Sequence, residues 1–137
     1  MPTLNEALGR YPGAVAFKYG DSAALNAEII QLVRAGRKTV TCDAWLAFAA
    51  RNEPLPKVGR TDIALDWAGA PQLAVRTVAV EKVAFCDVDA ARIPPQGEFR
   101  DLDHWRAGYE AYLRRAGIFR EDVDILLETF EVVEDFS

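Results

Sequence analysis

The heptapeptide Ala35-Gly36-Arg37-Lys38-Thr39-Val40-Thr41 lies where two predicted elements of this chain meet. Before it, residues 22–35 carry apolar side chains on one helical face, which predicts an amphipathic helix. Gly36 stands where such a helix needs a left-handed residue in order to end. After it, the β-branched residues of segment 37–42 predict a strand. A helix, a tight stop and a strand therefore follow one another directly.

Short helices and strands alternate on both sides of this segment. Asp43 is expected to cap a short helix through its side-chain oxygen. The strand predicted at 72–85 is long enough to bend or bulge midway. Helices inserted among several antiparallel strands favour an α+β fold whose sheet curls into a small β-barrel with flanking helices. The remaining patterns predict helices at 4–10 and 102–116 and strands at 15–19, 62–67 and 125–133.

Length and composition place the chain among single-domain globular proteins. It has 137 residues, of which 50% are hydrophobic and 27% are charged, enough for one domain with its own core. No apolar run approaches the ~20 residues needed to cross a bilayer, and the N-terminus lacks the layout of a signal peptide. Two cysteines cannot build a disulfide framework. We therefore expect a soluble cytoplasmic protein without a membrane partner, whose oligomeric state the sequence leaves open.

Charge is unevenly distributed along the chain. Sixteen Lys and Arg against 21 Asp and Glu give a net charge of -5, the wrong sign for a protein whose whole surface binds nucleic acid. Residues 1–60 hold eight basic and five acidic side chains, whereas residues 61–137 hold eight basic and sixteen acidic ones. An anionic ligand is therefore expected to meet the first part of the chain, although these cations also fit an ordinary solvated surface. The basic residues concerned are Arg34, Arg37, Lys38, Arg51, Lys57 and Arg60.

Several kinds of chemistry find no support in the sequence. The only histidine is His104, so a zinc site would need carboxylates and two distant cysteines, and neither a metal site nor another cofactor is predicted. Both glycine-rich nucleotide-binding motifs are missing, as is the GxSxG nucleophile motif. Cys42 has no histidine nearby in the sequence to act as its base, so it is interpreted as a small buried residue.

Lys38 and Thr41 allow two interpretations. In the structural one, Lys38 is a cation at the C-terminal end of a helix, where the helix dipole favours it, and Thr41 is an ordinary strand residue. In the functional one, a lysine desolvated in a cleft loses its proton and acts as a base, and a threonine hydroxyl beside it attacks a carbonyl. The two residues are i and i+3 and would point to opposite faces of a regular strand. They can act together only if the strand is irregular or if Lys38 reaches round from the loop.

Several short motifs occur in a characteristic order along most of the chain. They are residues 19–22, 35–42, 54–59, 76–81 with Phe85, Trp105 in the last predicted helix, and residues 130–133. In this order, and around the element Gly36-x-Lys38-x-x-Thr41, the chain resembles the ASCH domain in its longer bacterial form. The resemblance implies a single PUA-like domain over residues 1–137: a small β-barrel core at 15–134 with flanking helices, and an N-terminal extension at 1–14.

The same resemblance implies recognition of RNA or of a modified nucleoside. Some ASCH proteins are implied to bind RNA, some to cleave it, and a short bacterial branch to hydrolyse the amide of acetylated cytidine. Carried over to this chain, Thr41 would attack the acetyl carbonyl and Lys38 would accept its proton. Glu98 would position Lys38 or protonate the leaving amine; its structural alternative is a solvated loop carboxylate.

Further residues are predicted to touch the ligand. Arg37 and Thr39 are candidate ligand contacts, and Arg37 would bind a phosphate group. Tyr19 and Trp45 are candidates for stacking on a base. Core packing is the alternative for both aromatic residues.

A hydrolase requires the lysine, threonine and glutamate to converge in one pocket, whereas a non-catalytic RNA-binding module requires a continuous basic surface with exposed aromatics. A ligand-sensing or protein-interaction domain that merely inherits the cleft is a third possibility.

Overall fold

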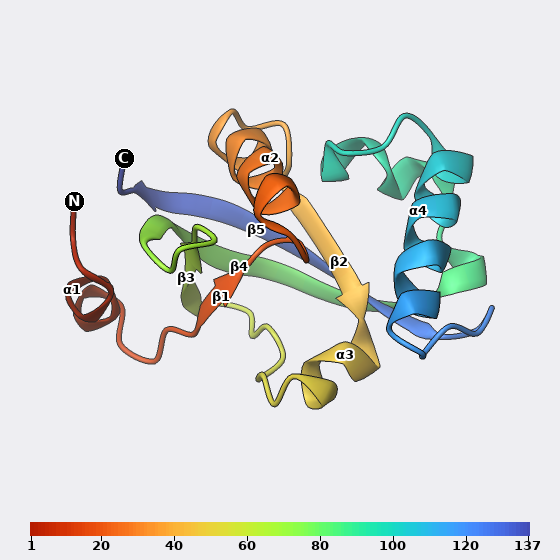
Figure 1. Cartoon of the computed structure of the whole chain (residues 1–137), viewed down its shortest axis with the longest axis horizontal. Helices are drawn as coiled ribbons and strands as arrows, with labels where there is room; N and C mark the ends of the chain where they lie inside the picture. The colour runs from red at the N-terminus through yellow and green to blue at the C-terminus, as the bar shows by residue number, and fades with distance from the viewer.

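The computed structural model describes the whole chain, residues 1–137. Its helices surround one sheet (Figure 1), and this mixture of helices with mostly antiparallel strands confirms the α+β class. In chain order the elements are α1 (Leu4–Arg10), β1 (Ala16–Lys18), α2 (Ala23–Arg34), β2 (Val40–Ala44), α3 (Trp45–Ala50), β3 (Thr61–Leu65), β4 (Pro71–Ala84), the short 3-10 turns η1 (Phe85–Asp87), η2 (Ala90–Arg92) and η3 (Pro94–Gln96), α4 (Leu102–Arg115) and β5 (Asp124–Asp135).

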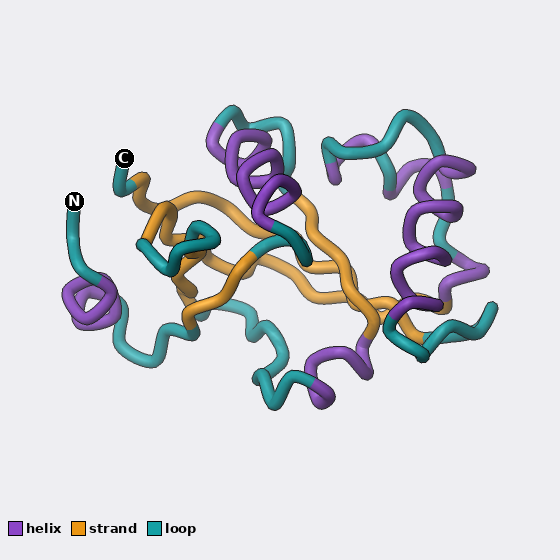
Figure 2. The backbone as a smooth tube through the Cα atoms, in the orientation of Figure 1, coloured by secondary structure: helices purple, strands orange, loops and turns teal.

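The five strands form one sheet in the order β1-β3-β4-β5-β2. β1 pairs parallel with β3, and all other neighbours are antiparallel. The long strands β4 and β5 cross the middle of the molecule between the helices (Figure 2). β4 shifts its register with β5 between Ala74 and Val75 and again between Thr77 and Ala79. These irregularities confirm the bulge expected midway along this strand.

The expected closure of the sheet into a barrel is wrong, because β1 and β2 remain the two edges of an open sheet. The outer edge of β2 is covered by other groups. Tyr109 of α4 donates its hydroxyl to the backbone carbonyl of Cys42 at 2.9 Å, and the Thr39 amide donates to the Pro95 carbonyl at 2.9 Å. With these edge groups already satisfied by a helix and a loop, no strand is needed to protect the edge.

The helix stop before β2 forms as the sequence predicts. Ser22 caps the start of α2 by accepting a hydrogen bond from the Leu25 amide, and Gly36 after its end has a φ of 75°. The amides of Arg37 and Lys38 both donate to the Leu32 carbonyl, so these two residues close the helix. The strand therefore begins at Val40, three residues later than the sequence pattern suggests.

Asp43 is not the cap of α3, contrary to expectation. The residue at the cap position is Ala44, which makes no side-chain capping bond. The Asp43 carboxyl instead accepts hydrogen bonds from the Ala44 amide and from the hydroxyl of Tyr112. Its position in an edge strand beside α4 therefore outweighs its local preference for a helix start.

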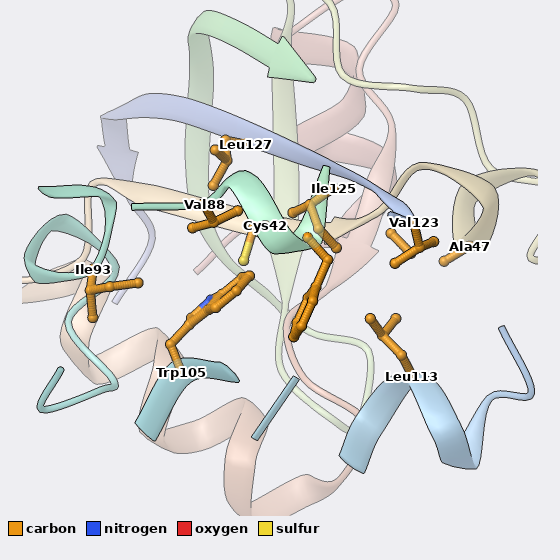
Figure 3. Close-up of a cluster of buried hydrophobic side chains, with 11 residues drawn as sticks. Cys42, Ala47, Val88, Ile93, Trp105, Leu113, Val123, Ile125 and Leu127 are labelled. Carbon is orange, nitrogen blue, oxygen red and sulfur yellow. The ribbon is translucent and has the colours of Figure 1, made fainter. Parts of the chain in front are cut away.

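Two separate apolar clusters fix α2 and α4 on the sheet. Figure 3 shows the α4 cluster, in which the Cys42 sulfur points toward the Trp105 ring and Leu113 lies further along the helix. The α2 cluster joins that helix to the central strands through Ile29, Val33 and neighbouring residues. Because each helix has its own apolar contacts, the space between them is not filled by core side chains.

The N-terminal helix and the C-terminal end of β5 lie at the same end of the sheet (Figure 1). Arg10 of α1 forms an ion pair with Glu134 of β5 at 2.6 Å, and Tyr11 donates its hydroxyl to the same carboxyl. None of the helices has the length and apolar character that crossing a bilayer requires.

The apolar anchoring of α4 predicts unequal effects for two leucines. Leu113 of α4 is 0% exposed, whereas Leu46 of α3 is 57% exposed. Leu113→Ala should lower the free energy of unfolding by about 2–5 kcal/mol, because it removes buried contacts and leaves a cavity. The matched change Leu46→Ala should alter it by about 0.5 kcal/mol or less. Urea denaturation measures both, and equal effects would contradict the described packing.

Candidate functional site

A cleft with two lobes lies along β2, the first lobe between α2 and α4 and the second beside α3 and the segment that follows it. In Figure 1, β2 runs between α2 and α4. The first lobe has a volume of about 350 Å³ and the second one of about 170 Å³. Both are lined by residues 18–20, at the end of β1, and by residues 41–43 of β2. The edges of the open sheet therefore form the wall shared by the lobes, and the first lobe has the size of a small-molecule site.

Lys38 and Glu98 form a buried ion pair at this cleft. The lysine is 1% exposed, and its Nζ lies 2.5 Å from Glu98 Oε2, where it donates a charge-assisted hydrogen bond. The same Nζ donates to the Gln96 carbonyl at 3.2 Å. Glu98 lines the first lobe, but Lys38 does not. The pair therefore presents its carboxyl to the cleft and keeps the ammonium group behind it.

The turn that carries Glu98 is held tightly against the start of β2. Gly97 has a φ of 75°, and a Cβ atom at this position would stand 2.8 Å from the Arg37 carbonyl oxygen. Gln96 is 0% exposed, and its Oε1 accepts hydrogen bonds from Trp105 Nε1 at 3.0 Å and from the Cys42 thiol at 3.2 Å. A buried glutamine and a glycine therefore bring together two charges that lie 60 residues apart in the sequence.

Thr41 lines both lobes of the cleft. Along β2, Cys42 and Ala44 belong to the α4 cluster, so by strand alternation Thr41 points to the opposite face. Lys38 precedes the strand, in the loop between α2 and β2. No hydrogen bond joins the Thr41 hydroxyl to Lys38 or Glu98.

The other predicted ligand contacts are divided between the cleft and the surface. Tyr19 lines both lobes and is also part of the α2 cluster. Arg37 and Thr39 are exposed and line neither lobe. Trp45 is also outside the cleft, where the Lys82 ammonium lies 4.9 Å from its ring centroid. Arg37, Thr39 and Trp45 can touch only a ligand that extends beyond the two lobes.

Most of the cations expected to meet an anion are already neutralised within the protein. Arg34 pairs with Asp135, and Lys38 pairs with Glu98. Four of the six have such partners, because Arg51 and Arg60 also contact carboxylates. The excess of positive charge in the first part of the chain therefore does not form a free basic surface.

The first lobe has more acidic than basic side chains in its lining, although three of the acidic ones, Asp21, Asp43 and Glu98, are held in ion pairs. Its lining contains two basic side chains and four acidic ones. Burial raises the pKa values of Tyr19 and Tyr109 well above the usual range, so these phenols stay neutral and contribute no further charge. The charged residues concerned are Lys18 and Arg115 on the basic side and Asp21, Glu28, Asp43 and Glu98 on the acidic side.

Sequence reasoning missed several residues of the cleft. Tyr109 and Tyr112 line the first lobe from α4, although their helical spacing indicated only core packing. Glu128 lines the second lobe from β5, and the one available signal was an acidic residue inside the apolar run of that strand. Since the cleft joins segments far apart in the chain, spacing alone could not assign these residues to one site.

Comparison with known proteins agrees with this architecture. The family model described as the ASCH domain matches residues 15–134. The chain belongs to the ASCH domain family. Membership of this family suggests an RNA-associated function. A search among curated proteins found no match to this sequence.

Solved structures extend the comparison to most of this ASCH domain. A protein from Enterococcus faecalis V583 is 27% identical with a TM-score of 0.81, and the match covers 97% of this chain and 86% of that one. An ASCH domain from Lactobacillus crispatus JV V101 is 25% identical with a TM-score of 0.75, over 93% of this chain and 84% of that one. A mutant ASCH protein from Zymomonas mobilis, 10% identical with a TM-score of 0.52 over 90% and 73% of the two chains, shares the fold alone.

The two cysteines of this ASCH domain should differ sharply in reactivity. Burial raises the pKa of Cys42 to about 11, whereas Cys86 is exposed. At about pH 8, near the ordinary pKa of a free thiol, a disulfide reagent should modify only one thiol of the native protein but both thiols in denaturant. The variant Cys86→Ser should be unreactive until it unfolds. Rapid labelling of that native variant would contradict the buried position of Cys42.

Two left-handed glycines provide a test of the turn that holds Glu98. Gly97→Ala and Gly117→Ala share the backbone cost of about 1–2 kcal/mol for a left-handed residue, since φ is 75° and 74°. Only Gly97 meets a neighbouring atom too closely for a Cβ, because nothing lies within 4 Å of the one at Gly117. Gly97→Ala should therefore destabilise the protein more in urea denaturation. Equal costs would show that the approach of the turn to Arg37 is unimportant.

Proposed function

We propose that this ASCH protein is a hydrolase that binds a modified nucleoside in the cleft and cleaves the amide of an acylated cytidine-type base. The observation that carries the proposal is the buried Lys38–Glu98 ion pair, whose carboxyl lines the cavity that Thr41 also lines. Burying an ammonium group is costly unless it is paired. A fold that keeps such a pair beside a cavity with a free hydroxyl has the groups that acyl transfer needs.

The charge of the first lobe favours an uncharged nucleoside over an RNA strand. Three of its four carboxylates are already paired with cations, and its lining holds no cluster of free cations, on which phosphate binding depends. The tyrosines Tyr19, Tyr109 and Tyr112 line the same lobe and present aromatic surface to a planar base. RNA cleavage, the alternative activity, would require the scissile phosphate to enter a lobe without a cluster of free cations.

The chemistry follows from the position of each group. Lys38 first passes its ammonium proton to Glu98 within the pair, and the neutral amine then takes up the hydroxyl proton as Thr41 Oγ attacks the acyl carbon. The carbon–nitrogen bond breaks, Glu98 gives its proton to the base nitrogen, which restores the ion pair, and the nucleoside leaves as the free amine. The acyl group remains as an ester on Thr41, and a water molecule then hydrolyses the ester, releasing a carboxylic acid and restoring the threonine hydroxyl.

A non-catalytic RNA-binding module is the second candidate function. It is favoured by the lack of a hydrogen bond between Thr41 and the ion pair, although such contacts often tighten only when substrate binds. An exposed aromatic side chain also adjoins the cleft. Trp67 is an exposed aromatic residue, and the ammonium of the cleft residue Lys18 lies 5.2 Å from its ring centroid. Stacking of a base on this tryptophan would need no catalytic group.

Release of carboxylic acid from a panel of N-acylated nucleosides tests the two functions. The wild-type protein should deacylate a cytidine derivative, and Lys38→Ala and Thr41→Val should each lose about 100-fold or more of kcat/KM, as expected when acid–base or nucleophilic catalysis is removed. The matched controls Lys82→Ala and Thr129→Val change exposed residues outside the cleft and should retain full activity.

Each alternative has its own outcome in that assay. Full turnover by Lys38→Ala would reject the lysine as part of the base. Binding of short RNA without any turnover, abolished by Trp67→Ala and unaffected by Thr41→Val, would favour the binding module. Circular dichroism of every variant separates a lost catalytic group from a lost fold.

A further inference from the structure

The second lobe contains one carboxyl group that differs from its neighbours. Four acidic side chains line this lobe. Three of them are held by arginines: Asp43 and Glu53 by Arg51, and Asp62 by Arg60. The fourth, Glu128, has no cation partner and accepts only from the Thr77 hydroxyl, at 2.7 Å from its Oε2. Its other oxygen, Oε1, receives no hydrogen bond from the protein.

Glu128 is placed next to Thr41 by the register of the sheet. The two residues are direct partners in the antiparallel pair of β2 and β5. Side chains of directly opposed residues lie on the same face with Cβ atoms roughly 4.5–5.5 Å apart. Both residues line the second lobe. The unpaired carboxyl and the candidate nucleophile therefore face the same ligand space.

Glu128 is only partly buried, and a ligand that displaces the remaining water from its carboxyl must supply a hydrogen-bond donor in its place. Removal from water raises the pKa of Glu128 above its usual value, an effect that the nearby Asp62 adds to and that the Thr77 hydroxyl and Arg60 oppose. The protein supplies only one donor to it. A ligand group that brings N–H donors would complete its hydrogen bonding, whereas a carbonyl or phosphate oxygen would be repelled.

We propose that the second lobe is a subsite for the amino group of a nucleobase, which donates its hydrogen bond to Glu128. The assignment rests on the proposed function for its choice of base, because a carboxylate accepts from the amino group of cytosine and not from the carbonyl of uracil. The volume of about 170 Å³ suits one edge of a base, while the larger first lobe takes the remainder of the nucleoside.

The position of Glu128 also agrees with the chemistry assigned to Thr41. In an acylated cytidine the nitrogen that carries the acyl group retains one hydrogen, and the acyl carbon is one bond away. Glu128 would accept from that nitrogen while the neighbouring Thr41 faces the carbon. The carboxyl is therefore a specificity residue that selects and orients the base, and it forms no covalent bond.

Calorimetric titration with cytidine and uridine tests the subsite, because the two nucleosides differ in this part of the base chiefly by an amino group against a carbonyl. The wild-type protein should bind cytidine about tenfold or more tightly than uridine. Glu128→Gln should abolish or reverse the preference, because its amide can donate to the uridine carbonyl. Glu121→Gln changes an exposed glutamate outside the cleft and should keep the wild-type preference.

A second variant guards against loss of the fold. Thr77→Val leaves the carboxyl in place and removes the hydroxyl that orients it, so it should reduce the preference for cytidine without abolishing it. Thermal melting establishes whether each variant is folded. An unchanged preference in folded Glu128→Gln, or no preference in the wild type, overturns the subsite.

The deacylation assay separates this inference from the proposed function. If Glu128→Gln raises KM with a smaller change in kcat while Thr41→Val loses kcat, both stand. If the preference for cytidine depends on Glu128 but nothing is deacylated, the hydrolase is overturned and the subsite is retained. If deacylation proceeds in Glu128→Gln with unchanged KM and unchanged preference, only the subsite is overturned.

Discussion

The ammonium group of Lys38 is removed from water, and much of the surrounding structure compensates for that. A lysine 1% exposed would be strongly destabilising without an opposite charge and further hydrogen-bond acceptors. Glu98 and the Gln96 carbonyl supply them. Both come from the turn before α4, so this turn must dock on the start of β2 whenever the lysine is buried. Once docked, this turn also forms one wall of the cleft, through Glu98.

The open sheet and the cleft have a common origin. α4 and its preceding turn satisfy the outer edge of β2 with a tyrosine hydroxyl and a backbone carbonyl. The two edge strands therefore contribute to a shared hollow instead of pairing with each other. Closing the barrel would fill the space in which residues 18–20 and 41–43 now face a ligand. The departure from the expected barrel is thus what provides the site.

Because side chains alternate along a strand, β2 places apolar residues in the α4 cluster on one face and a polar residue in the cleft on the other. Cys42 and Ala44 pack in the α4 cluster, where Cys42 also borders the cleft, while Thr41 points to the other face and lines both lobes. The partner strand follows the same rule, since Ile125 and Leu127 join the cluster and Glu128 faces the second lobe. A single pair of strands therefore supplies apolar anchoring on one side and polar groups on the other.

The sequence by itself determined the local features of this protein. Ser22 caps the start of α2 and Gly36 ends it. These features, and the apolar faces of α2 and α4, depend on residues only a few positions apart, so they can be read from the sequence. The family could be recognised for the same reason, because its motifs are short and ordered. Glu98 was assigned by that resemblance, and its contact with Lys38 emerged only from the fold. Only the tertiary structure decided whether the sheet closes, that Asp43 faces α4, and that Glu128 stands opposite Thr41. These outcomes depend on packing and on strand register between segments far apart in the chain, where competing long-range contacts outweigh the preferences of neighbouring residues.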